Sequence, residues 1–243
     1  MKNKILAVVS ARGGSKGIKL KNLKKIDGKP LIYFSLKYLS KVKKIDKIVV
    51  STDNNKIKQA VKFFFPKIEV LDRSKRLSTH SATLTEVVKE VSKELYNKGY
   101  KADYVLQIAP TCPFIKTSTV EKIINKLEKK NINCVVTLKR IEHEHPYRAK
   151  IFNKKSSIFK SHIKNINVEK FMSRQDLPEM YCTSGAIYAR DYKLLQTFNP
   201  KKINFCLGKN PIGIIVSDKE SVNIDRPIDL EFAKFLYKKK IKK

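Results

Sequence analysis

Short apolar runs alternate with helix-length amphipathic segments along most of this chain, and this alternation constrains the fold more than any other feature. The first run, Ile5–Val9, has the length of a buried strand, whereas 83–97 carries apolar residues at helical spacing. Strands that alternate with helices form a mainly parallel sheet covered by helices, because parallel strands need a crossover connection. The sequence therefore predicts an α/β sandwich. The predicted strands are 5–9, 47–51, 68–71, 103–108, 133–138, 185–189 and 212–216, and the predicted helices are 30–41, 54–64, 83–97, 117–130, 191–197 and 227–240.

The region 140–180 interrupts this alternation. It has no long periodic segment and favours irregular structure with short strands. Its apolar residues have no periodic element that would bury them against the sheet, and contiguous apolar surface of that kind marks association sites. We therefore expect a single domain over 1–243 that forms a homodimer through an insertion at about 140–180. The apolar residues concerned are Ile151, Phe152, Ile158, Phe159, Phe171 and Met172.

The formal net charge of +31 raises the question of a nucleic-acid partner. The basic residues are mostly lysine and are spread along every predicted element, without an RNA-binding motif that interleaves aromatic residues. Such an even distribution indicates a solvated basic surface, and we expect no specific nucleic-acid partner. The same charge suits acidic ligands.

The length of the apolar runs and the spacing of the cysteines indicate the cellular compartment. No run of about eighteen apolar residues is present, so we expect no membrane partner. The apolar run near the start is short and lacks a signal-peptide cleavage pattern. The four cysteines are widely spaced without a C-x-x-C pair, which favours reduced thiols over disulfides or a zinc site. These features predict a cytoplasmic protein.

The stretch Ala11–Asn22, directly after the first predicted strand, has the composition of a phosphate-binding loop. Its glycines allow backbone N–H groups to approach phosphate oxygens, and its cations supply fixed positive charge. It lacks the order of a P-loop and that of a dinucleotide fingerprint. Because ligands bind at the carboxyl ends of parallel strands, the stretch predicts a triphosphate site. The residues are Arg12, Gly13, Gly14, Ser15, Lys16, Gly17 and Lys21.

The order Ala-Arg-x-x-Ser-Lys-Gly-x-x-x-Lys-Asn in this stretch resembles the signature of the acylneuraminate cytidylyltransferases, enzymes that activate sialic acids with CTP. The resemblance implies a Rossmann-like three-layer sandwich of the nucleotide-diphospho-sugar transferase type, with a mainly parallel sheet. It extends over nearly the whole chain in the family's order. The further matching segments are 28–32, 48–53, 109–113, 174–178, 184–188 and 221–225.

The resemblance implies roles for nucleotide-binding residues. Lys21 and Arg12 match catalytic positions at the triphosphate, and Asn22 matches an asparagine near cytosine. Arg73 matches a nucleotide-side arginine, with Arg76 as the competing candidate. The implied nucleotide-binding set is Ala11, Arg12, Gly13, Ser15, Lys16, Lys21, Asn22, Arg73 and Thr83. Thr83, like Ser81, equally suits a helix cap.

The resemblance also implies a sugar side and a metal. Candidates for the sugar acid are Gln107, Arg174, Gln175 and Tyr188, since an arginine suits a carboxylate. Asp225 is expected to bind Mg²⁺, together with Asn223 on a strand-like segment 221–224. The family has Asp where this chain has Asn223, Asn where it has Ser184, and often Gln where it has Ala109. The departure at Asn223 bears on whether a second metal ion binds, and those at Ser184 and Ala109 bear on which sugar binds.

The expected reaction transfers CMP from CTP to a nine-carbon 2-keto-3-deoxy sugar acid, of the sialic or legionaminic type, and releases pyrophosphate. A related alternative is an enzyme for another keto-deoxy sugar acid, such as an octulosonic acid; the inserted pair Lys21-Asn22 argues against that one. An alternative of another class is a nucleic-acid-binding protein on a degenerate nucleotidyltransferase fold.

Overall fold

The computed structural model describes residues 3–15, 17–79, 81–164, 166–167, 170–171, 173–202 and 206–241. Its centre is a seven-stranded sheet in which β10 runs antiparallel to both of its neighbours and the other pairs are parallel. The strands, in order across the sheet, are β11 (Ile212–Ile215), β7 (Cys134–Arg140), β10 (Tyr181–Asp191), β6 (Tyr104–Ile108), β1 (Ile5–Ser10), β4 (Lys47–Thr52) and β5 (Glu69–Asp72). The prediction of a mainly parallel α/β fold is therefore confirmed.

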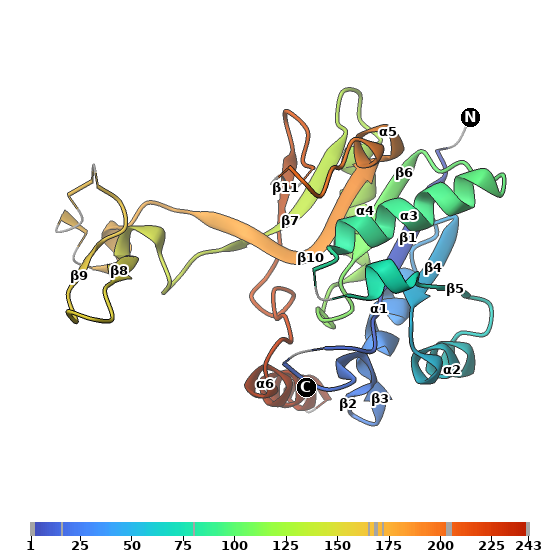
Figure 1. The fold of residues 1–243 in the computed structure, drawn as a ribbon, viewed down its shortest axis with the longest axis horizontal. Helices are drawn as coiled ribbons and strands as arrows, with labels where there is room; N and C mark the ends of the chain where they lie inside the picture. The colour runs from blue at the N-terminus through green and yellow to red at the C-terminus, as the bar shows by residue number, and fades with distance from the viewer. Residues whose placement is uncertain are drawn as a thin grey trace.

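Helices cover both faces of this sheet. Alternate residues of the central strand β1 point to opposite faces, so β1 contributes to an apolar cluster on each side. Ala7 and Val9 pack into one apolar cluster with α1, α2 and α4, whereas Leu6 and Val8 pack into a second cluster with α3 and α5. The result is three layers, with two cores separated by the sheet (Figure 1). The helices are α1 (Leu31–Leu39), α2 (Asn55–Phe64), α3 (Leu84–Asn97), α4 (Thr117–Leu127), α5 (Tyr192–Gln196) and α6 (Pro227–Ile241).

The last helix packs outside the main layers. Leu230 and Ala233 of α6 are buried in a third cluster with Ile26, which lies in the hairpin of β2 (Lys25–Ile26) and β3 (Lys29–Pro30). Figure 1 shows α6 beside this hairpin, below the sheet. The chain that leads into α6 thereby passes the end of β1. In the part of the chain that the structure describes, no helix is long and apolar enough to cross a bilayer.

Two sequence predictions need correction. The segment 221–224, expected to be strand-like, is a loop that a hydrogen bond from Ile224 N to Thr111 O (2.9 Å) holds in place. The strand predicted at 185–189 is longer, because β10 extends from Tyr181 to Asp191. A bend at Gly185, whose φ is 75°, interrupts its pairing with β7 between Thr183 and Tyr188.

The interrupted region forms an arm. Beyond β7 and β10 the chain forms a separate two-stranded sheet of β8 (Lys150–Phe152) and β9 (Phe159–Ser161), and Figure 1 shows it far from the seven-stranded sheet. Four of its hydrophobic side chains are exposed by more than half: Ile151, Phe152, Ile158 and Phe159. Phe171 packs against Tyr147 at 5.2 Å between ring centroids, and Met172 lies outside the described residues.

Candidate active site

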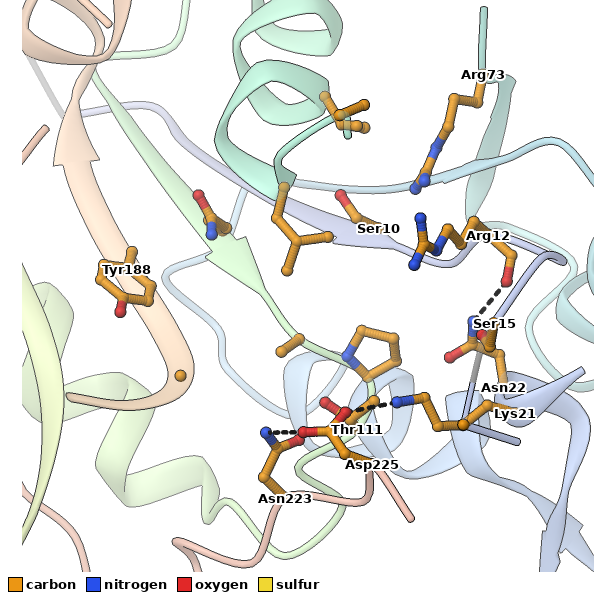
Figure 2. A pocket seen from close by; sticks show the side chains of 18 residues that line it. Ser10, Arg12, Ser15, Lys21, Asn22, Arg73, Thr111, Tyr188, Asn223 and Asp225 are labelled. Carbon is orange, nitrogen blue, oxygen red and sulfur yellow. Dashed lines mark hydrogen bonds and ion pairs between the residues drawn. The ribbon is translucent and has the colours of Figure 1, made fainter. Parts of the chain in front are cut away.

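A cleft of about 570 Å³ opens where β1 and β6 end. The loops that follow these strands meet there with the loop that precedes α6, as expected for an open α/β sheet. Figure 2 shows cationic side chains on one side of the cleft and Tyr188 on the other. The lining residues are Ser10, Arg12, Ser15, Gly17, Lys21, Asn22, Arg73, Ala82, Leu84, Val87, Gln107, Ala109, Pro110, Thr111, Gly185, Tyr188, Asn223 and Asp225.

Lys21 and Asp225 lie 204 residues apart in sequence and form an ion pair across this cleft (Figure 2). The distance from Lys21 Nζ to Asp225 Oδ1 is 2.7 Å, and Asn223 Nδ2 donates to Asp225 Oδ2 at 2.9 Å. The Lys21 side chain is 13% exposed, whereas that of Asp225 is 62% exposed. A mostly buried ammonium group therefore faces an accessible carboxylate, where an anionic ligand can replace or extend the pair.

Gly17 explains how the loop after β1 comes so close to Asp225. A Cβ atom built on Gly17 would overlap the backbone carbonyl oxygen of Asp225. Only glycine allows this approach without a shift of the backbone. The glycine-rich composition of the loop thus positions Lys21 against the loop before α6.

Asn22 and Ser10 present polar atoms without partners at the same cleft. Asn22 Nδ2 donates to the backbone oxygen of Arg12 at 3.0 Å, so the amide is oriented. Asn22 Oδ1 and Ser10 Oγ are buried and lack hydrogen-bond partners among the described residues. A buried polar atom without a partner costs free energy, and a ligand or an ordered water restores the missing bond.

Arg73 adds a buried cation. It is 7% exposed, and its Nη2 donates to the backbone oxygen of Ser51 at 3.1 Å, while Nε has no partner in the described structure. Burial lowers the pKa of the Arg73 guanidinium to about 10; Asp53 opposes this shift and Arg12 adds to it. Arg73 thus remains charged near neutral pH.

The competing arginine lies elsewhere. Arg76 Nη2 pairs with Glu90 Oε2 at 2.7 Å, and Arg76 does not line the cleft. Of the two arginines that the sequence left open, the structure brings Arg73 to the cleft.

The floor of the cleft contains Gln107 and Tyr188, which are direct neighbours across β6 and β10. Both are buried, at 6% and 9% exposure. Gln107 lies on the face of the sheet that α3 covers, since its neighbour Val8 packs in the cluster with α3, and Tyr188 lies on the same face. Leu84 and Val87 of α3 also line the cleft. This half of the cleft combines an apolar wall with two polar groups, which suits an uncharged or mixed part of a ligand.

Some candidate residues lie next to the cleft rather than in its lining. Ala11 is buried and donates from its backbone to Ser51 O at 3.0 Å. Gly13 N donates to Asp53 Oδ1 at 2.7 Å, so that amide is already engaged. Thr83 Oγ1 accepts from Glu86 N at 3.2 Å and caps α3. Lys16 lies outside the described residues.

Arg174 and Gln175 lie in a short 3-10 helix of the arm and do not line the cleft of their own chain. Arg174 Nη2 pairs with Glu142 Oε2 at 3.0 Å, and the Arg174 side chain is 59% exposed. The structure therefore does not bring these two sugar-side candidates together with Gln107 and Tyr188.

Several lining residues were absent from the sequence prediction. Thr111 belongs to a matched motif and Ser10 directly follows the strand predicted at 5–9, so both carried a usable signal. Leu84 and Val87 carried none, because they resemble the apolar positions of any amphipathic helix, and Ala82 is an unremarkable residue before that helix.

The donor set at Asp225 fits Mg²⁺. This ion binds oxygen ligands and is held in proteins by one or two carboxylates together with substrate phosphates. Asp225 supplies an exposed carboxylate, and Asn223 is positioned beside it to add an amide oxygen after rotation. Within the described ranges, no group of three or more His, Cys, Asp or Glu side chains forms a site that would hold a metal without a ligand. Asp225 and Asn223 therefore fit a Mg²⁺ ion whose other ligands would include phosphate oxygens of the substrate.

Comparisons with known proteins agree with this geometry. A family model described as cytidylyltransferase matches residues 6–241. A pseudaminic acid cytidylyltransferase of Campylobacter jejuni is 30% identical, over 98% of this chain and 97% of that protein. A CMP-N,N'-diacetyllegionaminic acid synthase of Legionella pneumophila is 28% identical, over 93% of each chain. Among solved structures, a CMP:2-keto-3-deoxy-manno-octonic acid synthetase complexed with CTP has the same fold, with a TM-score of 0.72 at 20% identity over 98% of this chain and 100% of that chain.

Proposed function

Because this chain belongs to the cytidylyltransferase family, we propose that it transfers CMP from CTP to a nine-carbon 2-keto-3-deoxy sugar acid and releases pyrophosphate. The observation that carries the proposal is the cleft that joins Lys21, Arg12 and Arg73 to Asp225 at the end of β1. An enzyme for nucleotidyl transfer needs such positioned charges, because its work is alignment and charge stabilisation.

The reaction is an in-line displacement at the α-phosphorus. The anomeric hydroxyl oxygen of the sugar acid forms the new bond to the α-phosphorus and gives up its proton to solvent, while the bond from the α-phosphorus to the oxygen that bridges to the β-phosphate breaks. That oxygen keeps the electron pair of the broken bond, so pyrophosphate leaves with the additional negative charge. Lys21 lies at the contact with Asp225, and we assign it to the oxygens around the reacting phosphorus. Arg12 and Ser15 are assigned to the outer phosphates, because both side chains line the same side of the cleft.

We assign the cytosine ring to the side of the cleft formed by Asn22, Arg73 and Ser10. The polar atoms without partners support this assignment. Asn22 Oδ1 can only accept, which matches the amino group of cytosine and not the carbonyl oxygen of uracil. Arg73 can only donate, which matches the acceptor atoms of the ring.

We propose that Asp225, together with Asn223, holds Mg²⁺ that enters with the triphosphate. Bound there, the ion would supply positive charge to the phosphate oxygens. The exposed Asp225 carboxylate supports this role, and Lys21 keeps the carboxylate directed into the cleft.

We also propose that the chain works as a homodimer through the arm. Exposed apolar side chains on both strands of the β8–β9 sheet support this, because contiguous exposed apolar surface marks association sites. Most such assemblies are two-fold symmetric, so each arm would reach the other copy. Arg174 and Gln175 would then contribute to the sugar side of the partner's cleft.

The reaction is tested by pyrophosphate release. The purified protein is incubated with CTP, Mg²⁺ and one of four sugar acids: pseudaminic, N,N'-diacetyllegionaminic, N-acetylneuraminic or 2-keto-3-deoxy-manno-octonic acid. We expect release with at least one nine-carbon acid and little with the octonic acid. Release with the octonic acid alone would assign the related alternative, and release with none would refute the proposal. We also propose that the reaction takes place in the cytoplasm, since the four cysteines are widely spaced and form no C-x-x-C pair.

A further inference from the structure

The side-chain amide of Gln107 has a fixed orientation at the floor of the cleft. Arg190 Nη1 lies 3.2 Å from Gln107 Oε1, and Thr85 Oγ1 lies 3.0 Å from the same atom. Arginine has donors and no acceptor, so the Gln107 atom that faces it must be the carbonyl oxygen. The Nε2 atom of Gln107 therefore points away from Arg190 and Thr85.

Arg190 is itself immobilised. It is 1% exposed, and its Nε donates to the backbone oxygen of Cys206 at 2.7 Å. Its guanidinium carbon lies 5.1 Å from the centroid of the Tyr188 ring. A buried cation with contacts in two directions holds the Gln107 oxygen in place, since moving it away would leave a buried donor without a partner.

The opposite end of the amide is free for a ligand. Gln107 lines the cleft, and no described residue accepts a hydrogen bond from its Nε2. With the oxygen turned toward Arg190 and Thr85, Gln107 offers the cleft a hydrogen-bond donor and no acceptor. The positive charge of Arg190 below it further favours a ligand group that is electron-rich.

We propose that Gln107 selects the sugar acid by donating from Nε2 to a carbonyl-type oxygen of the sugar, either of its carboxylate or of an acylamino group. Arg190 is the positioning residue, because it does not line the cleft and reaches a ligand through Gln107. This inference rests on the proposed function and adds the chemical requirement that the sugar places an acceptor oxygen over Gln107. Asn22 and Arg73, which are assigned to the nucleotide, lie on the side of the cleft opposite Tyr188 (Figure 2).

The variant Gln107→Glu tests the orientation directly. One carboxylate oxygen would still accept from Arg190 and Thr85, so the fold and the buried contacts are retained. The other oxygen would present an acceptor and a negative charge where the wild type presents a donor. We expect the KM and the Kd for the sugar acid to rise about tenfold to a hundredfold, while the KM for CTP changes less than about twofold. Gln196→Glu is the matched control. Gln196 lies in α5, outside the lining of the cleft, and its Nε2 donates to Ser92 Oγ of α3, so both KM values should be unchanged.

Binding and turnover are measured separately. Sugar-acid binding is measured by calorimetry with a non-hydrolysable CTP analogue, using pseudaminic, N,N'-diacetyllegionaminic and N-acetylneuraminic acids as probes. An unchanged Kd in Gln107→Glu, or a rise in the KM for CTP instead, would overturn the inference. A wild type that binds a sugar acid without releasing pyrophosphate would refute the proposed reaction, and the ratio of the two Kd values would still decide the role of Gln107. A wild type that binds none of the probes would overturn both.

An analogue with a hydroxyl in place of the acylamino group distinguishes the two oxygens. If the acylamino oxygen is the acceptor, wild type and Gln107→Glu should bind this analogue about equally. If the carboxylate is the acceptor, the defect should persist. Arg190→Lys keeps the charge with fewer donors and should raise the KM for the sugar acid more than that for CTP. A purely structural role would lower the melting temperature and shift both KM values together.

Discussion

Removal of the Lys21 ammonium group should separate catalysis from stability. In the structure, Lys21 Nζ lies 2.7 Å from Asp225 Oδ1, and the carboxylate is 62% exposed. An ion pair with such an accessible partner contributes about 1 kcal/mol or less to the free energy of unfolding. Asp225 also keeps its bond from Asn223 at 2.9 Å, so the loop before α6 should remain in place in Lys21→Ala.

The expected effect on the reaction is larger. Loss of one pre-organised charge at the developing transition state costs about a hundredfold or more in rate, or about 2.7 kcal/mol. The rate of pyrophosphate release should therefore fall by more than the change in stability can explain. Initial rates at saturating CTP and sugar acid, together with a thermal melt, measure the two quantities on the same sample.

Two further variants make the result decisive. Lys21→Met keeps most of the buried side-chain stem and removes the charge, so it should lose about as much activity as Lys21→Ala. Lys47→Ala breaks a comparable pair at the edge of the sheet, where Lys47 Nζ lies 2.9 Å from Glu69 Oε2, and it should keep wild-type turnover. A folded Lys21→Met with near wild-type turnover would refute the assignment of Lys21 to the reacting phosphate.

The remaining predictions concern the metal, the base and the arm. Asp225→Asn should raise the Mg²⁺ concentration for half-maximal rate more than Asn223→Ala, because only Asp225 carries charge; equal shifts would place the metal elsewhere. Asn22→Ala should lower the preference for CTP over UTP about tenfold in kcat/KM, since it removes an oriented acceptor, and an unchanged preference would contradict the assigned base site. Replacing both Phe152 and Phe159 by Lys should convert a dimer into a monomer of 28.0 kDa by light scattering, whereas a wild type that is already monomeric would exclude the arm as an interface.

The fold was largely predictable because its signals are local. The strand at 5–9 is a continuous apolar run, and helix α3 carries both a helical apolar face and the capping box of Thr83 with Glu86. The direction of β10 was not predictable in this way. Its residues are buried like those of its parallel neighbours. Its antiparallel direction follows from the arm, because the chain leaves the sheet at the end of β7 and returns at that same end to begin β10.

The segment 221–224 shows a different limit. Its alternating polar and apolar residues have the pattern of a strand, but in the described part of the chain it pairs with no strand. It is instead a loop, whose only backbone bond to a distant segment among the described residues is that from Ile224 N to Thr111 O. The inference that Asn223 and Asp225 share a side nevertheless agrees with their hydrogen bond of 2.9 Å, because an extended backbone alternates its side chains with or without a partner strand.

The motifs predicted the candidate site correctly where their residues line the cleft of their own chain. Lys21, Asn22, Asp225 and Tyr188 come together at one cleft, and the resemblance to acylneuraminate cytidylyltransferases is confirmed at the level of the family. Arg174 belongs to the same set of motifs but lies in the arm. A sequence order cannot distinguish a residue that serves its own cleft from one that reaches a second copy.

Charge gave no guidance within this chain, because 53 of its 243 residues are lysine or arginine. Burial separates two arginines at or below the cleft from a surface arginine: Arg190 is 1% exposed and Arg73 is 7% exposed, whereas Arg76 has a side chain that is 68% exposed. Burial of a charge carries a desolvation cost, so a fold retains it only where contacts or a ligand offset that cost. In a chain covered with lysine, a cation's loss of solvent is therefore a better indicator of a binding role than its presence, and it directs attention to Arg73 in the lining of the cleft and to Arg190 against Gln107.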